Sequence, residues 1–206
     1  MKNIAVFISG GGTNLQSLID AFESGLIRGG RIEMVFSNKK DAFGLERAKK
    51  HNIPAIYSAP EDFPSPEEYD SRLAGLLKER GIGLVCLAGY MKILTKAFLD
   101  NFNGDIMNVH PALLPSFGGP GMYGMHVHEA VIGSGVKVSG CTVHFVDYGT
   151  DTGPIIIQKT VPVGQDDTPQ VLQNRILPLE HEAYREAVKL YCEGRLEIKG
   201  RKVFIR

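Results

Sequence analysis

The strongest candidate for chemistry is a pair of polar side chains at the end of an apolar run. Asn108 and His110 close the run Asp105–His110, and Pro111 ends it. Side chains two residues apart on a strand share a face, so an amide donor and an imidazole would point the same way. An unpaired polar group buried there costs about 1–3 kcal/mol, so the pair predicts either hydrogen-bonded core residues or a binding site. His110 taken alone favours the first interpretation.

A glycine loop, Gly10-Gly11-Gly12-Thr13-Asn14, is the second candidate. It lies between a predicted strand and a predicted helix, where backbone N–H groups favour an anion. The dinucleotide fingerprint fails because Leu15 stands where Gly or Ala is required, and no Gly-Lys-Ser/Thr occurs. The loop therefore favours a monophosphate over a dinucleotide. The alternative is a tight turn in which Thr13 or Asn14 caps the helix.

The remaining polar motifs are weaker. The turn Gly89–Lys92 follows another apolar run, and Asp151 lies in a turn flanked by Gly and Pro. Such an aspartate is by itself an ordinary turn residue. His126 and His128 have no third ligand at a suitable spacing, so we predict no metal site.

Composition excludes several classes of protein. The chain has 206 residues, enough for one core, and its 23 Lys and Arg balance 23 Asp and Glu. A zero net charge argues against a protein whose main function is to bind nucleic acid. The apolar run Ile4–Ile8 is too short for a signal peptide or a membrane span. The odd cysteine count, without any CxxC pair, predicts reduced and mostly buried thiols in a cytosolic protein.

Strands and helices that alternate must position these candidates. Apolar runs predict strands at Asn3–Ser9, Arg31–Ser37, Ile53–Tyr57, Gly83–Ala88, Asp105–His110, Gly140–Asp147 and Ile155–Val163. Helical spacing and caps predict helices from Asn14 to Gly25, at Asp41–His51, from the Ser65 cap to Gly81, and at Thr95–Phe102, His126–Ile132 and Pro169–Cys192. This order predicts an α/β fold: a mostly parallel sheet, helices on both faces and a mixed edge.

We expect one domain over residues 1–206, because no linker, repeat or low-complexity segment divides the chain. The tail Arg195–Arg206 is predicted to be an exposed hairpin that turns at Lys199-Gly200, with its basic side chains protecting an edge. In an open parallel sheet, ligands bind beyond the carboxyl ends of the strands. The glycine loop, the Gly89–Lys92 turn and the Asn108–Pro111 segment all meet that condition.

Four segments together resemble the phosphoribosylglycinamide formyltransferases of purine synthesis. They are ISGGGTNLQ at 8–16, LAGYMKIL at 87–94, NVHPALLPSF at 108–117 and GCTVHFVDYGTDTGP at 140–154. The resemblance implies a single three-layer, Rossmann-like formyltransferase domain that carries a formyl group from 10-formyltetrahydrofolate to the amine of glycinamide ribonucleotide. It further implies a cytoplasmic monomer or homodimer that uses no metal and binds no nucleic acid or membrane.

The resemblance also assigns roles by position. Asn108, His110 and Asp151 match the catalytic residues, and His144 matches a histidine beside them. Gly12, Thr13 and Asn14 match the loop that binds the substrate phosphate, and Glu180 matches a carboxylate that holds the same substrate. The folate-binding segments correspond to Met91, Lys92, Ile93 and Leu94, and to Asp147, Tyr148, Gly149, Thr150 and Asp151 together with Asn108. Two positions depart from the family pattern: Pro66 and Lys92 both stand where Arg is common.

These residue types suit formyl transfer. Attack of an amine on a formyl carbon places negative charge on the former carbonyl oxygen, and hydrogen-bond donors aimed at that oxygen stabilise it. Asn108 offers an uncharged donor and protonated His110 a charged one. We expect Asp151 to raise the pKa of His110 and to accept, directly or through water, the proton that the amine loses.

Three alternatives remain. A formyltetrahydrofolate hydrolase uses a similar trio with water as acceptor, but usually carries an additional N-terminal regulatory domain, for which the strand at Asn3 leaves no room. A formyltransferase acting on initiator tRNA would need a second, RNA-binding domain and a basic surface. A nucleotide-binding module without catalysis would keep the glycine loop, but would have no reason to match the family at Asn108, His110 and Asp151.

Overall fold

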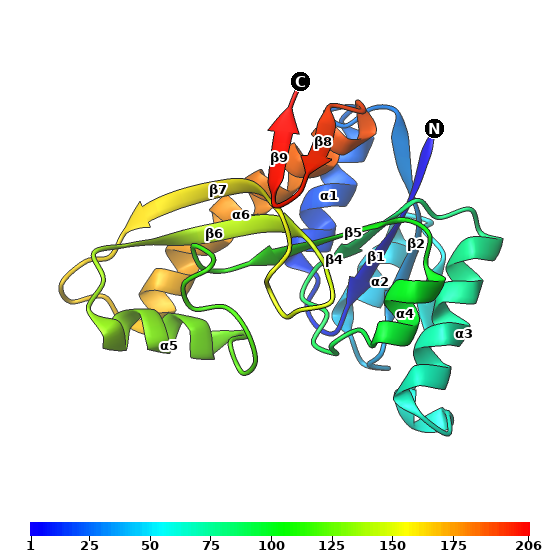
Figure 1. Ribbon diagram of the computed structural model, residues 1–206, viewed down its shortest axis with the longest axis horizontal. Helices are drawn as coiled ribbons and strands as arrows, with labels where there is room; N and C mark the ends of the chain where they lie inside the picture. Colours follow the sequence, from blue (N-terminus) through cyan, green and yellow to red (C-terminus); the bar gives the residue numbers. More distant parts are fainter. The chain divides into compact units, whose positions relative to one another are not determined.

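The computed structural model describes residues 1–206 and has the predicted α/β composition (Figure 1). The strands are β1 (Lys2–Ile8), β2 (Gly30–Ser37), β3 (Ala55–Tyr57), β4 (Leu84–Leu87), β5 (Asp105–His110), β6 (Val138–Phe145), β7 (Ile155–Pro162), β8 (Leu196–Lys199) and β9 (Lys202–Ile205). The helices are α1 (Thr13–Glu23), α2 (Phe43–Lys50), α3 (Pro66–Glu79), α4 (Lys96–Asn101), α5 (Met125–Ser134) and α6 (Pro169–Cys192), with a short 3₁₀ turn at Pro60–Asp62.

The chain divides into two compact units, Met1–Met107 and Asn108–Arg206, which we call the first and second units. Strand β5 crosses the boundary between them. The expectation of one domain over residues 1–206 stays a prediction.

The first unit contains a parallel sheet. Strand β1 pairs in parallel with both β2 and β4, and β3 pairs in parallel with β2. Residues Ile4–Ile8 of β1 have no exposed surface. Such a strand is buried on both faces, which is why its sequence is a continuous apolar run without alternation.

Helices cover both faces of this sheet. On one face, the Phe7 ring of β1 lies 4.9 Å from the Phe36 ring of β2 and 6.1 Å from the Phe98 ring of α4. Successive strand residues point to opposite faces, so Ile8 faces the other way, where it meets Gly44 of α2. The prediction of a parallel sheet between helices is confirmed for this unit.

Helix starts in the first unit follow two different rules. Ser65 caps α3 as predicted, because its Oγ accepts a hydrogen bond from the Glu68 N–H at 3.1 Å. Helix α1 is different: Gly12 is its N-cap, at a φ of 69°, and no side chain caps it. The predicted cap by Thr13 or Asn14 is therefore wrong, because a left-handed glycine starts the helix one residue earlier.

The second unit carries the mixed edge. Strands β6 and β7 are antiparallel, β7 and β9 are parallel, and β8 and β9 form the predicted antiparallel hairpin. Helix α6, the long orange helix of Figure 1, packs on β6 and β7 and also against α5. Its start is fixed by Thr168, whose Oγ1 accepts from the Val171 N–H at 3.3 Å. None of the protein's helices combines the length and apolar character that crossing a membrane requires.

Candidate functional site

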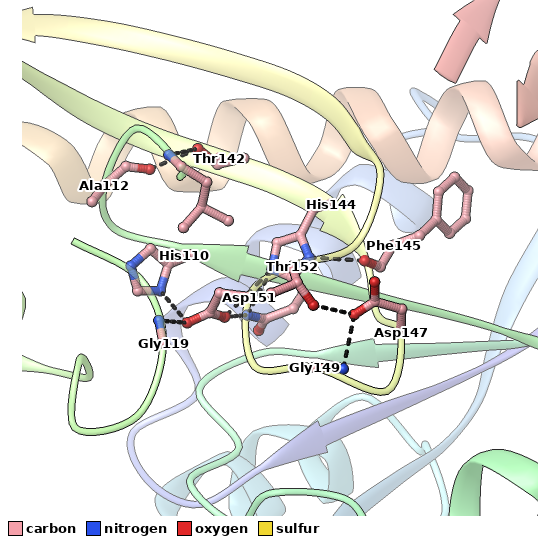
Figure 2. Close-up of polar contacts among 12 residues, drawn as sticks. His110, Ala112, Gly119, Thr142, His144, Phe145, Asp147, Gly149, Asp151 and Thr152 are labelled. Carbon is pink, nitrogen blue, oxygen red and sulfur yellow. Dashed lines mark hydrogen bonds and ion pairs between the residues drawn. The ribbon is translucent and has the colours of Figure 1, made fainter. Parts of the chain in front are cut away.

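Asp151 lies at the centre of a cluster of polar side chains in the second unit (Figure 2). Its Oδ2 is 3.6 Å from Nδ1 of His110, and its Oδ1 is 3.6 Å from Nε2 of His144. Asn108 donates from Nδ2 to Asp151 Oδ1 at 3.5 Å, and the same nitrogen lies 3.3 Å from His144 Nε2. The structure therefore brings together the residues that the sequence predicts as the catalytic trio and the adjacent histidine.

Backbone carbonyls orient both imidazole rings. His110 Nε2 lies 2.7 Å from the Phe117 carbonyl oxygen, and His144 Nδ1 lies 2.8 Å from the Phe145 carbonyl oxygen. A carbonyl can only accept, so each of these nitrogens carries a proton. The other nitrogen of each ring faces Asp151: His110 Nδ1 faces Oδ2, and His144 Nε2 faces Oδ1. Each ring is thus held at one nitrogen and faces the cluster with the other.

Burial determines the charge of His110. Only 3% of the residue is exposed, and this burial lowers its pKa below the ordinary 6.5. The Asp151 carboxylate and the Phe117 carbonyl act to raise the pKa, as expected for a nearby anion and an acceptor, but they do not outweigh burial. This differs from the expectation of a raised pKa for His110, because the sequence does not reveal how much water the ring loses. In the free protein the ring is predominantly neutral at pH 7.

The Asp151 carboxylate is kept ionised. Burial alone would raise its pKa, but the His144 ring, the N–H of Gly119 and the nearby His110 together lower it below 3.8. The Gly119 N–H donates to Oδ2 at 3.0 Å. Asp151 also has a left-handed backbone, with a φ of 58°, which an aspartate tolerates better than most residues. The site therefore combines an ionised carboxylate with two buried imidazoles.

Gly118 makes room for this carboxylate. A Cβ at position 118 would lie 2.4 Å from Leu114 Cδ2 and 3.2 Å from Asp151 Cβ. Any side chain there would have to displace one of the two. The glycine-rich segment after β5 thus packs directly against the Asp151 side chain.

A buried threonine that the sequence analysis does not single out supports the segment after β5 (Figure 2). Thr142 of β6 has no exposed surface, and its Oγ1 donates to the Ala112 carbonyl at 2.7 Å. The same oxygen accepts from the Leu114 N–H at 3.0 Å and from Gln158 Nε2 at 3.1 Å. In the sequence, Thr142 is recognisable only as a polar residue within an apolar strand.

Asp147 shapes the loop that carries Asp151. Its Oδ1 accepts from the Gly149 N–H at 3.1 Å and from Thr152 Oγ1 at 2.5 Å, so the carboxylate closes a turn within the loop. Tyr148, at the tip, is 70% exposed. Of the predicted folate-binding residues in this loop, Asp147 is therefore engaged within the loop, by Gly149 and Thr152, whereas Tyr148 is largely exposed.

The predicted site residues of the first unit lie at the carboxyl ends of β1 and β4. Ser9, the residue between β1 and the glycine loop, connects the two places. Its N–H donates to the Gly89 carbonyl at 3.1 Å, and its Oγ accepts from the Met91 N–H at 2.8 Å. Ser9 Oγ also donates to Asn38 Oδ1 at 2.6 Å. The glycine loop and the β4–α4 loop, residues 88–95, are thereby held side by side, as the strand order predicts.

Helix α2 supports the glycine loop through residues that the sequence analysis does not identify. The Gly44 N–H donates to the Gly10 carbonyl at 3.1 Å, and Arg47 Nε donates to the Gly11 carbonyl at 2.8 Å. A Cβ on Gly12 would lie only 2.9 Å from the Gly44 Cα. Helix α2 thus packs so closely that only glycines fit at the contact.

Other predicted positions lie as follows. In the first unit, Met91 and Ile93 are 50% and 67% exposed, whereas Lys92 turns inward, and Pro66 occupies the first turn of α3. In the second unit, Glu180 is half-buried on α6. The Cys141 thiol has a pKa raised to about 12, mainly by burial, and the nearby Glu180 carboxylate adds to this rise. No three His, Cys, Asp or Glu side chains gather into a set that could hold a metal ion.

This arrangement can perform acyl-type chemistry. An amide N–H₂ and an imidazole lie beside an ionised carboxylate, which supplies donors for a developing oxyanion and an acceptor for a proton.

Comparisons with known proteins point in the same direction. A phosphoribosylglycinamide formyltransferase from Haemophilus influenzae is 40% identical over 205 residues, which cover all of this chain and 94% of that protein. The crystal structure of glycinamide ribonucleotide transformylase 1 from Symbiobacterium toebii superposes with a TM-score of 0.93 at 46% identity, covering 100% of this chain and 94% of that one.

Some relatives are much longer. The trifunctional purine biosynthetic protein adenosine-3 of Drosophila pseudoobscura pseudoobscura is 44% identical over 196 residues, but the chain spans only 14% of its length. The model of the formyl transferase family matches residues 2–188. That match covers most of the sequence, including the cluster around Asp151 and both loops of the first unit, and the chain therefore belongs to the formyl transferase family.

Proposed function

We propose that this protein is a phosphoribosylglycinamide formyltransferase, which transfers the formyl group of 10-formyltetrahydrofolate to the amine of glycinamide ribonucleotide. The observation that carries the proposal is the cluster of Asn108, His110 and Asp151 around one ionised carboxylate. Full-length relatives with this name support the choice of acceptor. We place the activity in the cytoplasm, in a monomer or homodimer, with two small-molecule substrates and no need for a metal.

The proposed first step is addition. The substrate amine attacks the formyl carbon, a carbon–nitrogen bond forms, and the carbonyl electron pair moves to oxygen. Asn108 Nδ2 and the His110 ring are the donors assigned to that oxyanion. Burial keeps His110 predominantly neutral beforehand, and an adjacent oxyanion would favour the protonated ring. His110 would therefore take up a proton from water as the charge develops and return it to water when the oxyanion collapses.

The second step is collapse of the tetrahedral intermediate. The attacking nitrogen loses a proton, which we assign to Asp151, directly or through a water. The bond between the formyl carbon and N10 of the folate then breaks, the carbonyl re-forms, and N10 takes up the proton that Asp151 accepted, which releases tetrahydrofolate and returns Asp151 to its ionised form. The lowered pKa of Asp151 supports this role, because the carboxylate is available as an acceptor at neutral pH.

The remaining assignments concern binding. Gly12, Thr13 and Asn14 start α1 and are assigned to the substrate phosphate, with Glu180 assigned to the same substrate. The β4–α4 loop around Met91–Leu94 and the loop Asp147–Asp151 are assigned to the folate. Exposed apolar side chains at Met91, Ile93 and Tyr148 support the folate assignment, because an aromatic pterin gains from apolar contacts.

One assay tests this function: consumption of 10-formyltetrahydrofolate with and without glycinamide ribonucleotide. Acceptor-dependent turnover is the expected result. Turnover without the acceptor would instead indicate a formyltetrahydrofolate hydrolase, and binding without turnover a nucleotide-binding module.

The trio is tested by His110→Ala, Asp151→Asn and Asn108→Ala. Loss of one oxyanion donor typically lowers the rate about 10²–10³-fold, so we expect kcat to fall by that order for Asn108→Ala and His110→Ala. Asp151→Asn removes the proton acceptor and is expected to lower kcat by about 10²-fold or more. Circular dichroism and thermal unfolding serve as folding controls. A variant that folds and keeps more than about a tenth of the activity contradicts its assigned role.

A further inference from the structure

Asp70 is a fully buried carboxylate in the middle of α3. It has no exposed surface, and each of its oxygens has a separate partner from the β4–α4 loop. Oδ1 lies 2.8 Å from the Lys92 ammonium nitrogen, and Oδ2 accepts from the Thr95 N–H at 2.6 Å. A carboxylate removed from water is tolerated only when charges and donors satisfy it in this way. One side chain thus holds the loop at two points.

Lys92 is directed inward by this contact. Its side chain is only 16% exposed, and its ammonium lies 5.1 Å from the centre of the Tyr69 ring, within range of a cation–π interaction. The residues on either side do the opposite: Met91 is 50% and Ile93 is 67% exposed. The inward lysine therefore fixes which side chains of the loop point outward.

The other end of the loop is anchored independently. The Met91 N–H donates to Ser9 Oγ at 2.8 Å, and the Gly89 carbonyl accepts from the Ser9 N–H at 3.1 Å. Ser9 thus holds the start of the loop against the end of β1, and Asp70 holds its end against α3. Met91 lies at the Ser9 anchor, and Ile93 lies between the two residues that Asp70 holds, Lys92 and Thr95.

We propose that Asp70 is a positioning residue for formyl-folate binding: it acts through Lys92 and Thr95 to hold the β4–α4 loop so that Met91 and Ile93 face the ligand. Lys92 then contributes to folate binding through its backbone and by holding the loop in place, because its ammonium pairs with Asp70. This inference rests on the proposed function, because that function assigns Met91–Leu94 to the folate.

The charged pair suits positioning better than stability. Compared with apolar residues of similar volume, a buried ion pair contributes little to folding free energy, because desolvation offsets the attraction. Its two-point geometry does restrict the loop to one conformation. A purely structural role would affect both substrates alike, whereas a positioning role affects the folate selectively.

The experiment compares Asp70→Asn, Lys92→Arg and the double variant Asp70→Asn/Lys92→Met. Asp70→Asn keeps an acceptor for the Thr95 N–H but loses the ion pair. The double variant removes both charges, so no unpaired charge is buried. Glu46→Gln is the matched control, because it breaks an exposed lysine–carboxylate pair of similar length, 2.7 Å, on α2.

Two measurements are made on the whole protein. Hydrogen exchange of residues 88–95 reports the loop without reference to activity, and calorimetry gives the Kd of tetrahydrofolate. For Asp70→Asn and the double variant we expect faster exchange and a rise in that Kd of roughly tenfold or more, with an unchanged KM for glycinamide ribonucleotide. Lys92→Arg retains a cation and is expected to raise that Kd less than Asp70→Asn does, whereas Glu46→Gln is expected to leave both the exchange and the Kd unchanged.

Unchanged exchange and unchanged tetrahydrofolate affinity in the double variant would overturn the inference. So would an equal loss of affinity for both substrates together with a lower Tm. A failure of the proposed function is distinguishable: the original protein would then show no formyl transfer, while the exchange and tetrahydrofolate measurements would still decide the role of Asp70.

Discussion

At the scale of single residues, the second unit depends on side chains whose partners come from distant parts of the sequence. Asp151 contacts Asn108, His110 and the Gly119 N–H, each of which lies more than thirty residues away in the sequence. It also contacts His144 of β6. Because these residues share the Asp151 carboxylate, a substitution at one partner changes the hydrogen bonding and electrostatics of the others. We therefore expect effects of substitutions in this cluster to be non-additive.

Thr142→Val tests the buried hydroxyl that supports the segment after β5. The substitution keeps the shape of the side chain but leaves the Leu114 N–H and the Ala112 carbonyl without this partner. We expect the free energy of unfolding to fall by about 2–3 kcal/mol, measured by urea denaturation. Thr142→Ser keeps the hydroxyl and serves as the control, with an expected loss of about 1 kcal/mol from the missing methyl group. Equal losses in the two variants would contradict the role of the hydroxyl.

At the scale of elements, the contact between the glycine loop and α2 distinguishes neighbouring glycines. Gly12 has a φ of 69° and would place a Cβ 2.9 Å from the Gly44 Cα, whereas a Cβ on Gly11 meets nothing within 4 Å. We expect Gly12→Ala to raise the KM for glycinamide ribonucleotide by roughly tenfold or more, because the start of α1 must shift. Gly11→Ala is the control and should bind nearly as well as the original protein. Steady-state kinetics with a saturating formyl donor measures both.

The packing of the segment after β5 leads to a second prediction at this scale. A Cβ at position 118 would overlap Leu114 and crowd Asp151, so we expect Gly118→Ala to lower kcat as well as stability. Gly133, inside α5, has open space around it and a helical backbone, so Gly133→Ala should stabilise the protein by about 0.5–1 kcal/mol. Turnover and thermal unfolding of both variants provide the test. A Gly118→Ala variant with unchanged turnover and an unchanged Tm would show that this glycine does not constrain Asp151.

At the scale of the whole molecule, buried histidines set the response to acid. Burial lowers the pKa of His110, His128 and His181 below the ordinary value of 6.5. The unfolded chain therefore binds more protons than the folded one just below that pH, and stability must fall as the pH falls through 6.5 towards the lowered values. Asp151 adds to the loss at still lower pH, because its folded pKa lies below 3.8.

We expect the free energy of unfolding to decrease between pH 7 and pH 5, and His128→Gln to reduce this decrease. The substitution removes one buried group that must take up a proton on unfolding. Urea denaturation at several pH values measures the slope, and Ser134→Ala on the same helix is the control because it changes no titratable group. An identical slope in His128→Gln and the original protein would contradict the assignment.

Local sequence patterns predicted most of the fold and the identity of the candidate site. Apolar runs located the strands to within a few residues, and the Ser65 cap and the Pro169–Cys192 spacing located two helices at their observed starts. These signals are local: periodicity, capping and turn chemistry act over a few residues. The same holds for the motifs around Asn108, His110 and Asp151, which the family resemblance could identify without any knowledge of packing.

Only the tertiary structure decided how these residues behave. It showed that burial outweighs Asp151 in setting the pKa of His110, that Lys92 turns towards Asp70, and that Gly12 must be small because Gly44 packs against it. Each of these depends on the depth of burial or on a partner far away in the sequence. Desolvation and close packing arise from the whole fold, so the sequence by itself determined the elements and the chemical groups, and the folded chain determined their charge, orientation and spacing.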